Sequence, residues 1–256
     1  MEYIRTKNED HVLHILLDRD RSNAMDIQVV NELIQVLEEA DTNPAIEGII
    51  LSGKEGFFSS GLDLITLFDY GKEEMREFWT SFMKLLRVFV GFSKPSVAAI
   101  TGHSPAGGCV VALCCDYRLM AEGDYIIGLN EVPVGIVVPE SIFTLYSFWL
   151  GRAVAYRNLL EGRLFKPEEA LAIGLVDEVV PFDRIQTAAI RRLKTVMQFE
   201  KNAWRITKLN LRGELIRAME QEQGIMVEKV LEQWWKPSTR EVLKTIIHNL
   251  TQKKLG

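Results

Sequence analysis

The segment Gly102-His103-Ser104-Pro105-Ala106-Gly107-Gly108-Cys109-Val110 contains the turn that decides the fold. The apolar run at residues 96–100 before it predicts a buried strand, and the small residues at 106–115 predict a helix. Glycines between the two permit a tight turn and the close approach of a ligand to the backbone. The segment therefore predicts a strand that turns directly into a helix start, where main-chain N–H groups remain unpaired.

The sequence on either side of this turn repeats the order strand, helix, strand. Val12–Leu17 predicts a strand, Asp26 is a suitable N-cap for the helix that follows, and residues 46–51 predict a second buried strand. Further expected elements are a long amphipathic helix at 73–92, β-like pieces at 117–121, 125–129 and 177–180, and short helices around Gly151, Gly162 and Gly174. We predict an α/β core at residues 1–195 that carries the functional site, and a helical C-terminal region at residues 196–256.

The composition is typical of a globular protein with a sizeable core. Hydrophobic residues make up 47% and charged residues 25% of the 256 residues, which excludes a disordered chain, a collagen-like fibre and a disulfide-stapled miniature. The 30 basic and 35 acidic residues give a net charge of −5. Because binding along a nucleic-acid backbone requires a basic face, we expect no nucleic-acid partner.

The cysteines and the chain start indicate the compartment. Cys109, Cys114 and Cys115 lie within one apolar stretch, which is a poor disulfide framework and offers no second cluster for zinc. The start of the chain lacks the apolar region of a signal peptide, and no apolar run reaches the roughly 20 residues needed to cross a bilayer. We expect a cytoplasmic protein with buried, reduced thiols and no membrane association.

Two more segments are candidates for chemistry. In Phe58-Ser59-Ser60-Gly61-Leu62-Asp63-Leu64, a glycine before an acidic helix start leaves main-chain N–H groups that attract negative charge, although Asp63 alone is also explained as a helix cap. In the stretch 128–136, Glu131 is a lone carboxylate among apolar residues. Burial would raise its pKa toward the range of a general base, whereas the alternative is a loop glutamate that faces solvent.

The turn after residue 102 has two competing interpretations. Gly-His-Ser-Pro-Ala is one residue short of the G-x-S-x-G elbow of serine hydrolases, and His248 is the one later histidine available for a triad. The other interpretation uses the N–H of Gly107 as a donor to a developing oxyanion. No constellation of metal-ligating residues and no nucleotide-binding glycine motif accompanies these segments, so we expect no metal.

In this order, the segments resemble the crotonase family, also called the enoyl-CoA hydratase/isomerase family. The resemblance extends from the first strand to about residue 181. It rests on Asn23-Ala24-Met25, Phe58-Ser59-Ser60-Gly61-Leu62-Asp63-Leu64, Lys94-Pro95-Ser96-Val97-Ala98-Ala99-Ile100, Ala106-Gly107-Gly108-Cys109, Cys115-Asp116-Tyr117-Arg118 and Gly135-Ile136.

The resemblance implies a spiral of ββα repeats with a C-terminal helical extension, and an acyl-CoA substrate without any separate cofactor. It implies that the N–H groups of Leu62 and Gly107 hold the thioester oxygen and that Asn130 helps to position the thioester. It also implies a homotrimer or a dimer of trimers, assembled through the C-terminal helices. The residues expected to line the CoA groove are Ala24, Ser60, Gly61, Leu62, Asp63 and Leu64.

One departure from the family pattern narrows the reaction. Hydratases of the family resemble one another in having two glutamates, but here Val110 occupies the first position and Glu131 the second. The residues Ser104-Pro105-Ala106-Gly107-Gly108-Cys109 and Ile127-Gly128-Leu129-Asn130-Glu131 are most similar to the Δ3,Δ2-enoyl-CoA isomerase branch, in which a single glutamate transfers the proton. The expected activity is thus the shift of a 3-enoyl-CoA double bond to 2-enoyl-CoA. The alternatives are another crotonase-type enzyme (a hydratase, decarboxylase or thioesterase) and a non-catalytic acyl-CoA-binding protein.

Other charged residues have structural interpretations. Glu140 suits the dipole at a helix start, with a second catalytic acid as the alternative. Glu161 is interpreted as a surface residue. Lys253 and Lys254 are interpreted as a solvated tail, with contact to CoA phosphates as the alternative.

Overall fold

The main sheet contains six strands in the order β1-β2-β3-β5-β7-β10. The structure is a computed structural model that describes residues 1–221 and 224–254, apart from the side chains of residues 225, 253 and 254. β1 pairs with β2 in antiparallel fashion, and all other neighbours in this sheet are parallel. The strands are β1 (Ile4–Glu9), β2 (Val12–Leu17), β3 (Gly48–Ser52), β5 (Ser96–Ile100), β7 (Tyr117–Ala121) and β10 (Glu178–Val180).

A second, smaller sheet has the order β4-β6-β8-β9. Its strands are β4 (Gly56–Phe57), β6 (Gly102–Pro105), β8 (Ile127–Gly128) and β9 (Leu164–Phe165). A strand of the main sheet is followed by a strand of the small sheet and then by helix, first with β3 and β4 and again with β5 and β6. The expected α/β spiral of ββα repeats is confirmed.

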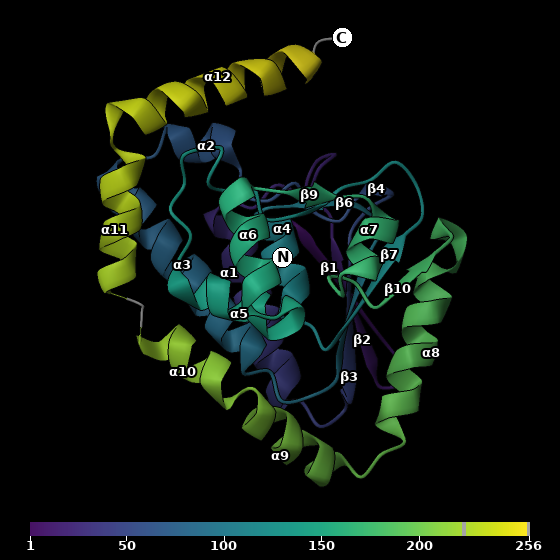
Figure 1. Ribbon diagram of the computed structural model, residues 1–256. Helices are drawn as coiled ribbons and strands as arrows, with labels where there is room; N and C mark the ends of the chain where they lie inside the picture. The colour runs from purple at the N-terminus through teal and green to yellow at the C-terminus, as the bar shows by residue number, and fades with distance from the viewer. Residues whose placement is uncertain (222–223, 255–256) are drawn as a thin grey trace.

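The helices occupy both faces of the main sheet and the periphery. Those within the spiral are α1 (Ile27–Thr42), α2 (Leu64–Phe68), α3 (Lys72–Val90), α4 (Gly107–Leu113), α5 (Glu140–Leu150), α6 (Arg152–Glu161) and α7 (Pro167–Ala172). After the short 3₁₀ turn η1 (Phe182–Arg184) come α8 (Ile185–Met197), α9 (Lys201–Leu211), α10 (Gly213–Gln221), α11 (Ile225–Trp234) and α12 (Pro237–Lys254). These five C-terminal helices run around the outside of the spiral, and α12 projects beyond it (Figure 1).

Several elements follow directly from local sequence. Val12–Leu17 and Ser96–Ile100 are strands with the bounds predicted, and Asp26 Oδ1 accepts a hydrogen bond of 3.0 Å from the Val29 N–H at the start of α1. β1 was missed, because its sequence IRTKNE is polar and Ile4 is its one buried residue. Such an edge strand lacks the apolar run that identified the other strands of the main sheet. The short strands β4, β6 and β9 were also not predicted, and the segment expected as a turn at Gly102–Pro105 is β6.

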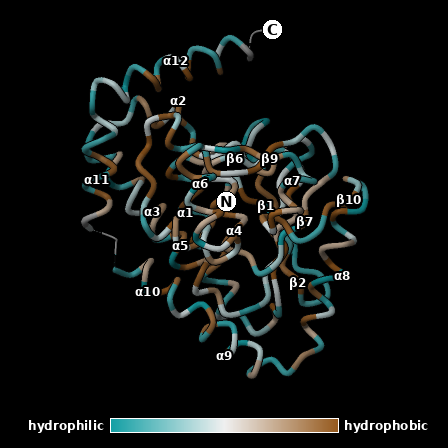
Figure 2. Tube along the Cα trace, in the orientation of Figure 1, coloured by the Kyte–Doolittle hydropathy of each residue, from teal (hydrophilic) through white to brown (hydrophobic). Residues whose placement is uncertain are grey.

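The two faces of the main sheet separate two parts of the core. Alternate strand residues pack against α1, α3 and α4 on one face and against α8 on the other. The apolar residues lie inside and the outer helices carry the polar surface (Figure 2). The predicted division at residues 195/196 falls within α8, whose Leu193 is fully buried against the sheet.

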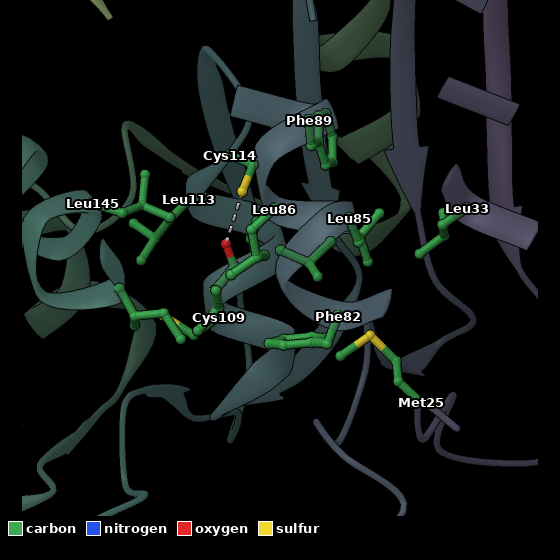
Figure 3. Close-up of a cluster of buried hydrophobic side chains, with 14 of the residues drawn as sticks. Met25, Leu33, Phe82, Leu85, Leu86, Phe89, Cys109, Leu113, Cys114 and Leu145 are labelled. Atoms are coloured by element: carbon green, nitrogen blue, oxygen red, sulfur yellow. Dashed lines mark hydrogen bonds between the residues drawn. The ribbon is translucent and has the colours of Figure 1, made fainter. Parts of the chain in front are cut away.

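The helix α4 lies in the centre of the larger core part. All seven of its residues are buried, and Figure 3 shows Cys109 and Cys114 near Phe82, Leu86 and other residues of α3, with Leu113 beside Leu145 of α5. Such deep placement requires small residues: a Cβ at Gly108 would lie 2.4 Å from the main-chain oxygen of Ser59. The three cysteines are free and buried, in keeping with the prediction of structural thiols.

A charged cluster attaches α9 to the spiral. The Asp116 carboxylate accepts hydrogen bonds from the Ser96 N–H at 2.8 Å and from the Ser96 hydroxyl at 2.9 Å. Lys208 Nζ lies 2.7 Å from Asp116 Oδ2, and Arg212 Nη2 lies 2.9 Å from Asp116 Oδ1. The two cationic side chains are only 5% exposed. Both would remain buried without a counter-charge if this carboxylate were lost.

We therefore expect Asp116→Asn to lower the free energy of unfolding by about 3 kcal/mol, as for other broken buried ion pairs. Chemical denaturation at pH 7 measures the change. Asp183→Asn is the control, because Asp183 is exposed in η1 and forms no ion pair within the described residues. A loss below about 1 kcal/mol in Asp116→Asn would show that the cluster is not an anchor.

Candidate active site

A cavity of about 200 Å³, here called the site cavity, lies between α2, α3, the start of α4 and the loop 130–139. Its wall is largely apolar, and Glu131 is the one ionisable side chain among the described residues that line it. The other lining residues are Ser60, Leu62, Leu64, Trp79, Phe82, Pro105, Ala106, Gly107, Val110, Asn130, Val134, Ile136, Val137, Val138, Pro139, Ile142, Ile246 and Leu250.

The segment before α2 leaves one main-chain donor unpaired. The Met25 N–H donates to the Gly61 carbonyl at 2.8 Å, and the Met25 carbonyl accepts from the Asp63 N–H at 2.9 Å. Because successive N–H groups of an extended segment point to opposite sides, the Leu62 N–H points away from Met25. It donates no hydrogen bond within the part of the chain that the structure describes.

The start of α4 provides the second unpaired donor. Ala106 precedes the helix with a positive φ of 50°, and Gly107 is the first helical residue. The N–H of a first-turn residue has no partner within its own helix. Among the described residues, nothing else accepts from the Gly107 N–H.

A close approach of two glycines brings these donors together. Gly61 has a φ of +88°, and a Cβ at this position would lie 3.1 Å from the Gly107 nitrogen. A Cβ at Gly107 would lie 3.4 Å from the Gly61 Cα and 3.2 Å from Leu62 Cδ2. The missing side chains therefore allow the two segments to pack backbone against backbone beside the cavity.

Glu131 lies in the loop after β8 and is 9% exposed. Its Oε2 atom is buried and accepts no hydrogen bond within the described residues. Burial raises the pKa of this carboxyl to about 7, and a hydrogen bond from its own main-chain N–H offsets the rise only in part. The interpretation as a loop glutamate facing solvent is wrong for this structure.

Among the described residues that line the site cavity, Glu131 has no second carboxylate beside it. Val110, on α4, is fully buried and lines the site cavity. The titratable groups that interact electrostatically with Glu131 are the Cys109 thiol and the Tyr146 phenol, and burial raises the pKa of both. These two groups are therefore neutral near pH 7, and of these three groups Glu131 is the one that can change charge there.

The other predicted groove residues divide into two sets. Ser60, Leu64 and Asn130 line the site cavity, whereas Ala24, Gly61 and Asp63 do not. Asp63 caps α2 by accepting from the Thr66 N–H at 3.1 Å, and it pairs with Arg19 at 2.7 Å. Its structural role as a cap is thus present, and its contact with CoA stays a prediction.

The remaining sequence candidates lie elsewhere. Ser104 is buried in β6 and His248 is exposed on α12, without a hydrogen bond between them, so the hydrolase elbow gains no support. Glu140 and Glu161 are exposed and do not line the site cavity. The side chains of Lys253 and Lys254 are outside those that the structure describes.

Sequence reasoning missed the contributions of α3 and α12 to the wall. Trp79 and Phe82, 3% and 2% exposed, reach the cavity from α3, and Ile246 and Leu250 reach it from α12. The spacing of three residues in the α3 pair and of four residues in the α12 pair is typical of an apolar stripe on one helix face, but it does not indicate what that stripe faces. The C-terminal region therefore also forms part of the cavity wall.

The profile of the enoyl-CoA hydratase/isomerase family matches residues 7–243. The chain belongs to this family. This member is 34% identical to the mitochondrial enoyl-CoA delta isomerase 1 of Mus musculus over 235 residues, which cover 91% of this chain and 81% of that protein.

Solved structures of relatives agree with the fold of this family member. It superimposes on the crystal structure of human mitochondrial Δ3,Δ2-enoyl-CoA isomerase with a TM-score of 0.94 at 29% identity, over 98% of this chain and 99% of that one. An enoyl-CoA hydratase/isomerase family protein from Pseudomonas syringae gives a TM-score of 0.83 at 26% identity, over 90% and 98% of the two chains.

The described part of this family member has neither a candidate membrane-spanning helix nor a candidate metal site. None of its helices there combines the length and the apolar character needed to cross a membrane. Within the same residues, no group of three or more His, Cys, Asp or Glu side chains could hold a metal ion. The predicted cytoplasmic location stays a prediction.

The burial of Glu131 predicts a pH-dependent difference in stability. Because the folded-state pKa of about 7 exceeds the usual 4.5, the folded protein holds this proton more tightly than the unfolded chain. Between these two pH values, the free energy of unfolding of the wild type should fall by about 3 kcal/mol relative to Glu131→Gln, and then level off. Urea denaturation from pH 4 to 8.5 measures it, with exposed Glu161→Gln as the control. A constant difference across this range would mean that Glu131 is hydrated.

Proposed function

We propose that this chain is a Δ3,Δ2-enoyl-CoA isomerase that moves a double bond of acyl-CoA with Glu131 as its acid/base. The Glu131 carboxylate takes a proton from C2 of 3-enoyl-CoA, and the electron pair moves onto the thioester oxygen as a dienolate. The same carboxyl group returns the proton at C4, which leaves 2-enoyl-CoA. The observation that carries this proposal is one buried carboxyl in a cavity that is also lined by Leu62 and Gly107, whose main-chain N–H groups donate no hydrogen bond among the described residues.

The electrostatics of Glu131 suit both proton transfers. A group with a pKa near the working pH is ionised often enough to act as a base and yet retains the proton long enough to deliver it. The apolar wall excludes water, which would otherwise exchange the proton or add to the double bond. The carboxyl oxygen without a partner is available to the substrate.

The N–H groups of Leu62 and Gly107 are proposed to hold the thioester oxygen. Charge develops on this oxygen when C2 loses its proton, so donors fixed in advance stabilise the dienolate more than the substrate. Losing one such donor typically costs about 10²–10³-fold in rate. Preorganisation is supported by the close approach of Gly61 and Gly107, because neither segment has to move to present its donor.

The lack of a second acid among the described residues that line the site cavity favours isomerisation over hydration. Hydration needs one group to activate water and another to protonate C2, and here the apolar Val110 occupies the cavity wall on α4. A single carboxyl can carry out the isomerisation, because it takes and returns the same proton. Glu140, the nearest acidic residue along the chain after Glu131, is exposed outside the cavity.

The CoA portion is assigned to the mouth of the cavity. Ser60, Leu64 and Asn130 are proposed to contact the thioester and pantetheine, and the main chain around Ala24, Gly61 and Asp63 the rest of CoA. No separate cofactor enters this reaction. The expected homotrimer or dimer of trimers belongs to this proposal.

Glu131→Gln should abolish isomerisation while acyl-CoA binding survives. We expect the turnover of 3-enoyl-CoA to fall by about 10⁴-fold, because the amide keeps the size of the side chain but cannot take a proton. Spectrophotometric detection of 2-enoyl-CoA gives the rate, and calorimetric titration with a saturated acyl-CoA gives the affinity. Near-wild-type turnover would exclude Glu131 as the base.

Two controls separate the rival activities. Glu140→Gln should keep wild-type turnover, because its side chain lies outside the cavity. Incubation of 2-enoyl-CoA in heavy-oxygen water should give no appreciable labelled 3-hydroxyacyl-CoA, and such a product would identify a hydratase instead. Binding of acyl-CoA without any deuterium exchange at C2 would identify a non-catalytic binding protein.

The pH dependence of kcat/KM should follow the ionisation of Glu131. Since the base must be ionised in the free enzyme, kcat/KM should rise with pH to an apparent pKa of about 7 and then remain constant. Phosphate monoesters titrate near pH 6, so a 3-enoyl pantetheine thioester without the 3′-phosphate is the control substrate. If the kcat/KM profile instead gave an apparent pKa near 4.5 with both substrates, Glu131 would not be a base buried away from water.

A further inference from the structure

The junction between α11 and α12 contacts both segments of the site cavity at once. One contact is with the loop that follows Glu131, and the other is with the end of α2, the helix that begins directly after the Leu62–Asp63 segment. Thr239 and Arg240, which are neighbours in the chain, make these two contacts. We call this pair the clasp.

The Thr239 side of the clasp packs on Gly135. Thr239 is 2% exposed, and its Oγ1 and Cγ2 atoms both lie 3.4 Å from the position that a Gly135 Cβ would occupy. Its hydroxyl accepts from Gln233 Nε2 at 2.8 Å and donates a long hydrogen bond of 3.4 Å to the Gly135 carbonyl. Gly135 belongs to a turn in which the Ile136 N–H donates to the Glu131 carbonyl at 2.9 Å.

The Arg240 side of the clasp holds the end of α2. Its Nη2 donates to the Phe68 carbonyl at 2.9 Å, and its guanidinium carbon lies 3.4 Å from the centroid of the Phe68 ring. The same guanidinium carbon lies 5.1 Å from the centroid of the Trp235 ring. Asp69 adds an electrostatic attraction to Arg240.

Neither of the two clasped segments is rigid through its own secondary structure. α2 has five residues, and the stretch 129–139 contains no helix or strand. Isolated helices of this length are not stable, and loops are held in place by their contacts. Hydrogen bonds to Met25 hold the segment before α2, and turn hydrogen bonds hold the loop after Glu131, so each segment has its own contacts. The clasp adds a link that joins the end of α2 to this loop.

We propose that Thr239 and Arg240 are positioning residues, which hold the segment that carries Glu131 at a fixed place relative to the segment that carries the Leu62 N–H. The inference rests on the proposed function, because it assigns these segments to the base and to the oxyanion donor. A misplacement of about 1 Å between reacting groups can cost about 10²-fold in rate. The clasp acts through other residues and does not touch the substrate itself.

The two sides of the clasp should have different kinetic signatures. Loosening the Thr239 side should admit water to Glu131 and lower its pKa, whereas loosening the Arg240 side should misplace the oxyanion donor without hydrating the base. The titratable groups facing Glu131 from α4 and α5 are Cys109 and Tyr146, which are neutral near pH 7. A shift of the pH profile would therefore report Glu131.

The test compares Thr239→Ala with Thr239→Ser, and Arg240→Met with Arg240→Lys, using the full chain. Thr239→Ala should lower kcat about 10-fold and lower the apparent pKa of the kcat/KM profile by at least half a pH unit. Thr239→Ser should restore both quantities to near wild type. Arg240→Met should lower kcat about 10-fold, while KM stays within two-fold of wild type and the apparent pKa of the kcat/KM profile does not change. Arg240→Lys should recover part of the rate. Lys244→Ala, exposed on the same helix, is the matched control and should change neither quantity.

A second measurement does not depend on turnover. In the Thr239→Ala background, the pH-dependent stability difference between Glu131 and its Gln variant should shrink, because a hydrated carboxyl has a smaller pKa shift. If the wild type had no isomerase activity but Thr239→Ala still reduced the pH-dependent stability difference, the proposed function would be overturned. The inference that the clasp positions the Glu131 segment would then still hold. Wild-type kinetics in Thr239→Ala and Arg240→Met, or losses that only match the fraction unfolded, would overturn the clasp.

Discussion

The site depends on the contact between the Gly61 segment and the start of α4. A side chain at Gly61 would meet the Gly107 nitrogen at 3.1 Å, so the two backbones can pack together only where no Cβ intervenes. The bridge to Met25 uses the groups on one side of the Leu62 segment and leaves its N–H on the other. Two unpaired donors thus become a permanent feature of the folded chain.

The electrostatics of the cavity follow from what surrounds these donors. Burial behind an apolar wall raises the pKa of Glu131 to about 7, and no cation among the described side chains opposes that rise. The folded protein therefore maintains a destabilising carboxyl of a kind often found at functional sites, where proton transfer benefits from such a pKa. In the proposed reaction the same wall would exclude water, so a single feature would set both the strength of the base and the choice between proton transfer and hydration.

Local patterns were sufficient for most of the main sheet, because its inner strands are apolar runs, but not for the short strands of the small sheet. The apolar residues around Glu131 left its burial open against a solvent-facing loop, whereas the glycines at 61 and 107 indicated the unpaired N–H groups. The polar edge strand Ile4–Glu9 was not predictable in this way, and neither were the cavity residues Trp79 and Ile246. Their apolar character indicates burial, but the partner that buries them comes from a distant part of the chain.

The sequence by itself determined the apolar strands of the main sheet, the small residues that let α4 enter the core, and the lone carboxyl among the apolar residues 128–136. These are properties of neighbouring residues, which fix backbone conformation and local polarity. The ββα order and the missing second carboxyl at Val110 came from the resemblance to the family. Only the tertiary structure decided that Asp63 pairs with Arg19, that Asp116 anchors α9, and that α12 returns to the cavity. Such contacts join segments separated by tens to more than a hundred residues, and their energies depend on distance and burial that no local pattern contains.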